Sequence, residues 1–318
     1  MPFLLLVLNS KQTHLWRKLV WIGLSLLLWL PVEAIAENLR VLLVLSGNTA
    51  LYQTFVKGFT QNLPSTTQVL VQEQAEAFVD NPQKFDLIVS VGLKAGQFVG
   101  LRTNTPLLAV MLPKASYEES LLKQRHSKEI SAIYLDQPWD RQIALVQAVL
   151  PNINRVGVLY SAAARLDVAE LGAVVARHKM VLYGQMLGTS DGMFSALDTL
   201  LDDSEALLAV PDSNIYSSNN IRNILLTTYR RGVPLIGLSQ AYVNAGALCA
   251  VFSTPEQIAV QASAMTLVFA QTRKLPDAEY PSLFTIAVNQ EVARTLSVPV
   301  LSPDTLRLQM DSVKRKAR

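Results

Sequence analysis

Short apolar runs alternate with longer amphipathic stretches along most of the chain. The runs are rich in Val, Ile and Leu with few polar interruptions, which is typical of strands buried on both faces of a parallel sheet. The stretches between them have helical periodicity, so the order indicates repeated strand–helix–strand units. We predict strands at Arg40–Leu45, Gln68–Gln72, Asp86–Val91, Leu107–Leu112, Ala132–Leu135, Arg155–Tyr160, Val181–Gln185, Ala206–Val210, Leu235–Leu238, Leu248–Phe252 and Phe284–Val288. We predict helices at Leu51–Asn62, Leu93–Arg102, Pro138–Val149, Leu166–Arg177, Met193–Leu201, Asn219–Arg231, Pro255–Thr272 and Gln290–Thr295.

Two parts of the chain share a sequence pattern. Residues Asn38–Ser46 match Ile153–Ser161, with an Arg-Val pair and the final serine in register. A second match aligns the apolar runs that follow Pro106 and Pro234. Because the matches occur in the same order, they predict two homologous α/β lobes. A coincidental α/β pattern is the alternative.

The predicted fold class is α/β, with two doubly wound parallel-sheet lobes joined by a multi-strand hinge. We expect lobe one to comprise residues 37–136 plus 254–276, and lobe two residues 137–253 plus 277–310. Residues 311–318 are expected to form a basic tail. Several crossings of the chain between two lobes favour hinge closure around a ligand.

The first 36 residues have the pattern of a secretory signal peptide. Three basic residues precede or flank the apolar run Leu19–Leu30, and Ala34-Ile35-Ala36 is a small-x-small cleavage site. An uncleaved membrane anchor is the alternative, but this run is shorter than the roughly 20 residues that span a bilayer. We therefore expect cleavage before Glu37 and a periplasmic location for the mature protein.

Composition and charge exclude several classes of protein. The 318 residues are 50% hydrophobic and 17% charged, which excludes a disordered or fibrous chain. The formal charge of +3 comes from 28 Lys and Arg against 25 Asp and Glu, and the excess lies in the expected signal peptide and in the last five residues. The body between them is mildly acidic and lacks a basic stripe interleaved with aromatic residues. We therefore expect no nucleic-acid partner.

The sequence lacks the local motifs of common enzymes. It contains no Gly-x-Gly-x-x-Gly, no Gly-x-x-x-x-Gly-Lys-Ser/Thr and no Gly-x-Ser-x-Gly. No His, Cys and carboxylate spacing indicates a metal site. Cys249 lies in an apolar run and is expected to be a buried side chain rather than a catalytic thiol. We expect His126 and His178 to be solvent-exposed, and we expect no cofactor and no catalysis.

Polar residues follow many of the predicted strands. Ligands of open parallel α/β sheets bind outside the carboxyl ends of the strands, where helix N-termini also present N–H groups. Hydroxyls, amides and carboxylates at these positions suit a zwitterionic or polyhydroxyl ligand, but the same residues are ordinary helix caps and turn residues. The candidate ligand-binding residues are Ser46, Asn48, Gly92, Asp136, Gln137, Ser161, Asp212, Ser213, Asn214 and Tyr242.

Some of these residues suit particular groups of a ligand. Ser46 or Ser161, each at a predicted helix start, is expected to hold a carboxylate together with backbone N–H groups. Asp212 or Asp136 is expected to pair with an ammonium. Tyrosines near strand ends, Tyr242 among them, are suited to stack on an apolar part of the ligand.

Segments of the second half of the chain carry a family resemblance. They are Leu150–Tyr160, Val210–Ser217, Gly232–Leu248 and Ala287–Ala293. Together they resemble type I periplasmic substrate-binding proteins, in particular the ABC-transporter substrate-binding family that includes tryptophan- and tyrosine-binding members. The resemblance implies the periplasmic-binding-protein type I fold, a small-molecule ligand, and the membrane permease of an ABC transporter as partner. The chain departs from the family pattern at Gly92-Leu93, where relatives carry Gly-Thr or Gly-Ser.

The leading hypothesis is a periplasmic solute-binding protein that closes on a small ligand, such as an amino acid, for an ABC-type permease. A ligand-sensing accessory module for a membrane receptor or signalling protein is an alternative with the same fold. A periplasmic enzyme that uses Asp212 with a water molecule is a third hypothesis.

Overall fold

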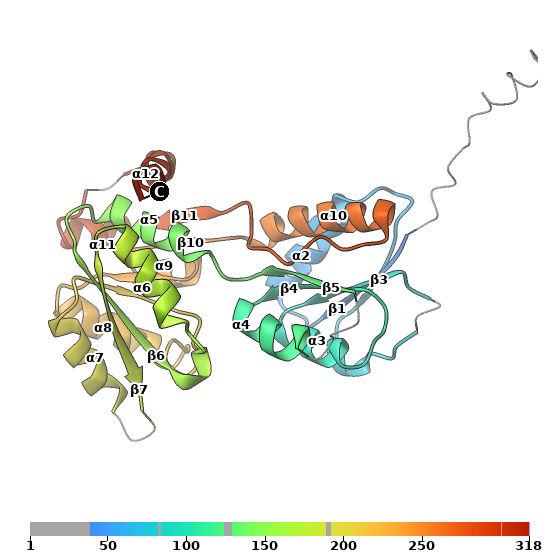
Figure 1. Ribbon diagram of the computed structural model, residues 1–318, viewed down its shortest axis with the longest axis horizontal. Helices are drawn as coiled ribbons and strands as arrows, with labels where there is room; N and C mark the ends of the chain where they lie inside the picture. The colour runs from blue at the N-terminus through green and yellow to red at the C-terminus, as the bar shows by residue number, and fades with distance from the viewer. Residues whose placement is uncertain (1–38, 82–83, 124–128, 189–191, 300, 318) are drawn as a thin grey trace, which may run out of the picture. The chain divides into compact units, whose positions relative to one another are not determined.

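Two β-sheets, each flanked by helices, organise the protein (Figure 1). The structure is a computed structural model that describes residues 39–81, 84–123, 129–188, 192–299 and 301–317. The expected signal peptide and His126 lie outside the described residues. We call the part built on the first sheet lobe one and the part built on the second sheet lobe two.

The first sheet is parallel throughout and has the order β2-β1-β3-β4-β5. Its strands are β1 (Arg40–Leu45), β2 (Gln68–Gln72), β3 (Leu87–Val91), β4 (Leu107–Leu112) and β5 (Ile130–Tyr134). Its helices are α2 (Ala50–Gln61), α3 (Leu93–Gly100), α4 (Lys114–Ser116) with the π-helical turns Tyr117–Leu122, and α10 (Pro255–Thr272). A single 3-10 turn covers Ala75–Ala77.

Both faces of the first sheet are buried along β1, β3, β4 and β5, as the apolar runs predict, whereas the edge strand β2 is largely exposed. Val41, Leu43 and Leu45 of β1 pack into one cluster with Phe55 and Phe59 of α2 and with apolar residues of α10. The intervening β1 residues pack into another cluster with α3. Figure 1 shows α2 and α10 on one face of this sheet and α3 and α4 on the other. Alternate residues of a strand point to opposite faces, so a continuous apolar run is needed to bury both.

The second sheet has the order β11-β10-β9-β8-β6-β7 and is parallel except for β11, which runs antiparallel to β10. Its strands are β6 (Arg155–Ser161), β7 (Val181–Leu187), β8 (Ala206–Leu208), β9 (Leu235–Gly237), β10 (Cys249–Phe252) and β11 (Thr285–Val288). Its helices are α5 (Trp139–Val149), α6 (Val168–Arg177), α7 (Met193–Asp202), α8 (Ile221–Arg230), α9 (Gln240–Ala245), α11 (Gln290–Thr295) and α12 (Pro303–Ala317), with a 3-10 turn at Ala162–Ala164. Two open, mostly parallel sheets with helices between their strands confirm the predicted α/β fold class.

The chain passes between the lobes after β5, after β10 and again before β11. Helix α10 begins at a capping box in which Thr254 and Gln257 satisfy each other's backbone N–H groups, with Pro255 in its first turn. It then packs along α2 and touches β4. The segment that follows returns to lobe two, where β11 pairs with β10.

Three features differ from the sequence-based expectations. Residues 114–122 and the segments of α9 and α12 are helical, although no helix is predicted there. Residues expected to form a basic tail continue α12 as far as Ala317. The prediction for His178 is wrong, because this side chain is buried and its Nδ1 lies 2.9 Å from Oε1 of Gln147. Cys249 is buried, as expected.

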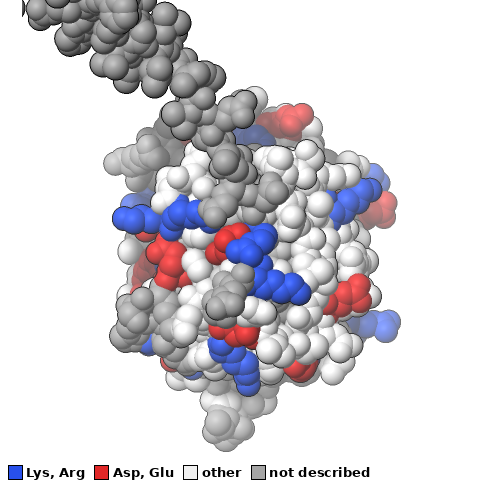
Figure 2. Space-filling model, turned by 90° about the vertical axis from the view of Figure 1, so that its right-hand side faces the viewer, with Lys and Arg blue, Asp and Glu red and all other residues white. Residues whose placement is uncertain are grey.

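Charged side chains of both signs are interspersed on the face drawn in Figure 2. Lobe one contains ion pairs between side chains of opposite charge. Arg40 contacts Asp86 with Nη2 3.1 Å from Oδ1, and Lys94 pairs with Glu76. Within the described ranges, no helix has the length and apolar character needed to cross a membrane.

Candidate ligand-binding site

A cavity of about 650 Å³ lies where strands of both sheets end. The loops and helix starts that follow β3, β4, β5, β6, β8, β9 and β10 all contribute to its wall, as the strand-end rule predicts. Lining residues from lobe one and the first crossing are Leu93, Gln97, Pro113, Ala115, Ser116, Ser120 and Leu135–Gln137. Those from lobe two include Gln142, Ala163–Arg165, Pro211–Ser213, Tyr216, Leu238, Ser239, Tyr242 and Val251–Ser253.

Three lobe-one candidates, Ser46, Asn48 and Gly92, do not line this cavity. Ser46 Oγ donates to the carbonyl of Val91 at 2.8 Å and accepts from the N–H of Ala95 at 2.9 Å, so it joins β3 to the start of α3. The Asn48 amide donates to Glu73 at 2.9 Å. Gly92 adopts a φ of 89° immediately before Leu93. The contacts of Ser46 hold the start of α3, which carries the lining residue Leu93, whereas the contact of Asn48 joins the ends of β1 and β2 outside the cavity wall.

Asp136 lies at the end of β5 and lines the cavity. Its Oδ2 accepts a hydrogen bond from the backbone N–H of Lys114 at 2.5 Å. Burial raises the pKa of the Asp136 carboxyl to about 6, although backbone hydrogen bonds and the charge of Lys114 act in the opposite direction. Asp136 is therefore a carboxylate at neutral pH that has lost part of its hydration.

Gln137 links, through hydrogen bonds, the three segments of the chain that cross between the lobes. Its Nε2 donates to Ser253 Oγ at 2.9 Å, and Ser253 Oγ donates to the carbonyl of Leu283 at 2.6 Å. Its Oε1 accepts from Nη1 of Arg141, which also donates to the carbonyl of Pro281. The side chain of Gln137 is thus occupied by contacts among all three crossings, next to the cavity.

Asp212 organises the strand ends of lobe two. Its Oδ2 accepts from the N–H of Ser161 at 2.6 Å, and its Oδ1 accepts from the N–H of Asn214 at 3.0 Å. The amide of Asn214 lies 3.4 Å from Ser161 Oγ. The structure therefore brings these candidates into one cluster that joins the end of β6 to the loop after β8. Of this cluster Asp212 lines the cavity, as does the neighbouring Ser213.

Aromatic and aliphatic side chains form the apolar part of the wall. Tyr242 Oη donates to the backbone carbonyl of Tyr216 at 2.9 Å, which fixes its ring against the loop after β8. Both tyrosines line the cavity together with Leu238, Val251 and Phe252. Burial raises the pKa of Tyr242, so its hydroxyl stays protonated and acts as a donor.

Several lining residues were not predicted from the sequence. Ser116 and Ser120 lie on the unpredicted helical segment 114–122, and Gln97 lies on α3. Arg165 follows the turn after β6 with a φ of 50° and forms an ion pair with Glu119 of lobe one. The sequence signal for the helical segment was Pro113 followed by Glu118 and Glu119, since proline and acidic residues favour helix starts.

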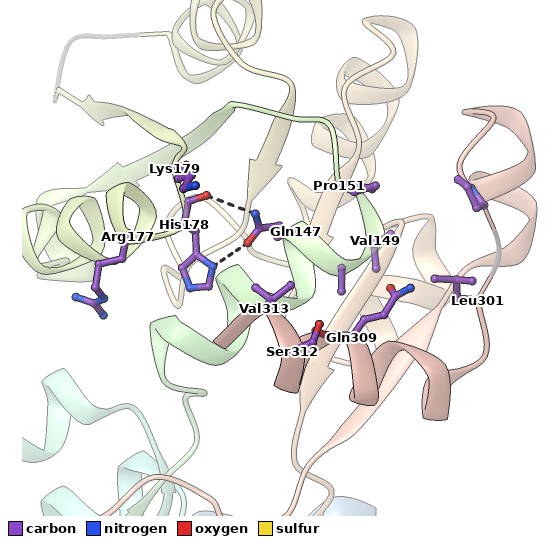
Figure 3. A pocket seen from close by; sticks show the side chains of 12 residues that line it. Gln147, Val149, Pro151, Arg177, His178, Lys179, Leu301, Gln309, Ser312 and Val313 are labelled. Carbon is purple, nitrogen blue, oxygen red and sulfur yellow. Dashed lines mark hydrogen bonds between the residues drawn. The ribbon is translucent and has the colours of Figure 1, made fainter. Parts of the chain in front are cut away.

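A second cavity, of about 580 Å³, lies away from these strand ends, between α5, the end of α6 and α12 (Figure 3). Figure 3 shows Gln147 joined to His178 by two hydrogen bonds. Because these polar groups bind each other and the wall comes from lobe two alone, we place the candidate ligand site in the first cavity.

Comparison with known proteins decides the family. Residues 60–312 match the family model described as ABC transporter substrate binding protein, which is more than half of the chain. The chain belongs to this family. Membership gives this ABC substrate-binding protein a solute-binding role, and the family generally binds its substrates without converting them. No curated protein matches the sequence significantly.

Solved structures of low sequence identity share the fold of this substrate-binding protein. An ABC domain from Streptococcus pneumonia in complex with L-Trp is 16% identical, with a TM-score of 0.62 over 85% of this chain and 98% of that chain. A ligand-free, open substrate-binding protein with adhesive properties from Clostridium difficile is 15% identical, with a TM-score of 0.67 over 84% and 97%. These likenesses confirm the type I periplasmic-binding-protein fold.

Proposed function

We propose that the protein binds a small ligand, such as an amino acid, in the cavity at the strand ends and presents it to an ABC-type permease. The observation that carries the proposal is the position of the cavity: both lobes contribute strand ends, a carboxylate and hydroxyls to one wall, and lobe two adds aromatic rings. A ligand held there contacts both lobes, so its binding energy can draw them together. The L-Trp complex of the streptococcal protein of the same fold supports an amino-acid ligand.

The candidate residues divide into two groups under this proposal. Asp136, Asp212, Ser213 and Tyr242 face the ligand, because they line the cavity. Gln137 also lines it, but its side chain bonds within the hinge. The positioning residues are Ser46, Gly92, Ser161 and Asn214, which lie in or contact the loops that carry lining residues. Asn48 contacts Glu73 outside the cavity wall and is assigned no role in binding.

The proposal includes a periplasmic location and the lobe boundaries expected from the sequence. The signal-like segment 1–36 would direct export and be removed. Lobe one would then comprise residues 37–136 plus 254–276, and lobe two residues 137–253 plus 277–310. Delivery to a permease requires the mature protein to reach the outer face of the membrane that holds the permease.

The proposal predicts that a free amino acid raises the thermal stability of the mature protein. A ligand at 100 times its Kd adds about 2.7 kcal/mol to the free energy of unfolding. Thermal-shift screening of amino acids, followed by mass spectrometry of any small molecule released from the purified protein, measures this. Absence of stabilisation by every amino acid, together with no released small molecule, contradicts the proposal.

A blocking variant tests whether the ligand binds in this cavity. Ser213 is exposed on the wall, so Ser213→Trp adds bulk inside the cavity with little effect on folding. We expect ligand-induced stabilisation to disappear in Ser213→Trp and to persist in Ser195→Trp, a matched change at an exposed position of α7. Equal stabilisation of both variants would place the ligand elsewhere.

A further inference from the structure

Acidic side chains outnumber basic ones around the ligand cavity. A smaller cavity of about 120 Å³ adjoins it and shares Asp136 and Arg165 with it. The carboxylates that line one or both cavities are Glu118, Asp136, Asp167, Glu170 and Asp212, whereas the cationic side chains are Lys114 and Arg165. The wall that a ligand meets therefore carries a surplus of negative charge.

Both cations of the wall have carboxylate partners from the protein. Lys114 Nζ lies 3.9 Å from Oε1 of Glu118, and Arg165 forms an ion pair with Glu119. Burial lowers the pKa of Lys114, but Tyr280, Glu118 and Glu170 outweigh this effect and raise the pKa above its ordinary value. These cations are charged and already neutralised, so they offer little to a ligand anion.

The two carboxylates that line the ligand cavity itself, Asp136 and Asp212, have a different environment. Asp136 accepts from the backbone N–H of Lys114, and Asp212 accepts from the N–H groups of Ser161 and Asn214. Over the described part of the chain, neither carboxylate forms an ion pair with a lysine or arginine side chain. Backbone N–H groups hold these carboxylates in place without cancelling their full charge, which leaves each able to bind a cation.

The remaining wall is suited to the uncharged part of a ligand. Leu93, Leu135 and Leu238 contribute aliphatic surface, and Tyr216 and Tyr242 contribute aromatic rings. A cavity of about 650 Å³ has the size of sites that take drug-sized or smaller molecules. The wall thus combines carboxylates for a cationic nitrogen with an apolar surface for the rest of the molecule.

We propose that this cavity, taken as the ligand site of the proposed function, selects ligands with a net positive charge, namely organic amines or basic amino acids that carry an apolar part. Such a ligand matches the surplus of carboxylates. The carboxylate of a neutral zwitterion would meet no free cation on the wall, and an acid would be repelled by Asp136 and Asp212.

Series of compounds that share one apolar body and differ in charge test this proposal. The indole series is tryptamine, L-tryptophan and indole-3-propionate. A matching phenol series starts from the amine tyramine, and a matching branched-alkyl series starts from the amine 3-methylbutylamine. L-Lysine and L-arginine are titrated alongside. By isothermal titration calorimetry at neutral pH, we expect a cationic compound to bind about tenfold or more tightly than the zwitterion of the same body, and the acid not to bind. For the basic amino acids the comparison is with L-glutamine.

The outcomes separate this inference from the proposed function. If a zwitterionic amino acid or an acid binds more tightly than its amine, the charge selection is wrong while the solute-binding function stands. If an uncharged sugar binds and the amines do not, the charge selection is again wrong and the solute-binding function again stands. If no amine, amino acid, acid or sugar binds, both proposals fail.

An isosteric variant tests the role of Asp136 directly. Asn in place of Asp136 keeps an oxygen to accept from the Lys114 N–H but removes the charge. Hydrogen bonds to charged groups are stronger than those to neutral groups, so we expect Asp136→Asn to weaken binding of the cationic ligand by about 10- to 100-fold. The control is Asp304→Asn on the exposed first turn of α12. Unchanged affinity in a folded Asp136→Asn protein would overturn the proposal, and Asp212→Asn gives a second, independent measurement.

The pH dependence gives a further readout of the same contact. Lys114, Tyr134 and Tyr280 interact electrostatically with Asp136, whose carboxyl has a pKa of about 6. The other charged groups that line the small cavity with Asp136 are Glu118, Arg165, Asp167 and Glu170. A cation binds the ionised carboxylate, so its affinity is retained above that pKa and falls as the pH drops from 7 to 5. We expect this fall to be absent in Asp136→Asn. A pH profile that is the same in both proteins contradicts the assignment.

Discussion

Replacing Gly92 with alanine is expected to lower the free energy of unfolding by about 3 kcal/mol. Gly92 adopts a φ of 89°, a conformation that residues with a Cβ rarely tolerate. A Cβ at this position would also lie 2.4 Å from Tyr52 Oη and 2.6 Å from Ser46 Oγ. Ser46 cannot move away freely, because it bonds to the ends of β3 and α3. Urea-induced unfolding measures the loss.

Alanine variants at two other glycines separate the stability cost of backbone strain from the cost of the steric clash. Gly232 has a φ of 66° with nothing within 4 Å of its would-be Cβ, so Gly232→Ala should cost only about 1 kcal/mol. Gly47 has neither constraint, and Gly47→Ala should change stability by less than about 0.5 kcal/mol. Tyr52→Phe removes one contacting atom and should recover part of the loss in Gly92→Ala. Equal losses for Gly92→Ala and Gly232→Ala would show that the clash is unimportant.

The position of each central strand was predictable because burial on two faces demands an uninterrupted apolar run. The whole of β3 is buried, and its sequence is apolar at every position but one. The direction of a strand relative to its neighbours, parallel or antiparallel, was not predictable in the same way. The run that forms β11 resembles the others, yet it pairs antiparallel to β10 at the edge of the sheet. Only the path of the chain after α10 determines that direction.

The helices that sequence patterns missed are either short, as α4 and α9 are, or rich in charged residues, as α12 is. Helix α12 is rich in charged residues, and it is anchored mainly by the buried Leu306 and Met310. Its terminal cations made it resemble a tail. His178 was misjudged because its neighbours Arg177 and Lys179 are charged. Gln147, which binds its ring, is distant in sequence.

At the candidate ligand site, the sequence predicted which strand ends form the wall but not the hydrogen-bond partner of each side chain. Asp136 and Asp212 lie on the cavity wall, in agreement with the strand-end rule. Ser46 directly follows β1 and Ser161 ends β6, yet their hydroxyls bond to other segments of the protein. A serine after a strand has the same sequence pattern in either role, because long-range neighbours decide which group its hydroxyl meets. Arg165 was missed because its partner Glu119 comes from the other lobe.

Asp212→Ala is expected to lower the free energy of unfolding by about 2–4 kcal/mol. Asp212 is only 5% exposed, and its two oxygens accept from the N–H groups of Ser161 and Asn214. Alanine would leave both donors without this acceptor, and a buried donor that loses its partner costs about 1–3 kcal/mol. Urea-induced unfolding compared with the unmodified protein measures the loss.

The matched variants show why this loss would be specific to the two hydrogen bonds. Asp212→Asn keeps one carbonyl oxygen, so it should lose about half as much stability as Asp212→Ala. Ser213→Ala changes the adjacent exposed side chain and should leave stability within about 0.5 kcal/mol of the unmodified protein. If Asp212→Ala unfolds at the same urea concentration as Ser213→Ala, the carboxylate does not hold the strand ends together. Its place on the cavity wall would then have to be explained by ligand contact alone, and the ligand titrations with Asp212→Asn would measure that contact without interference from folding.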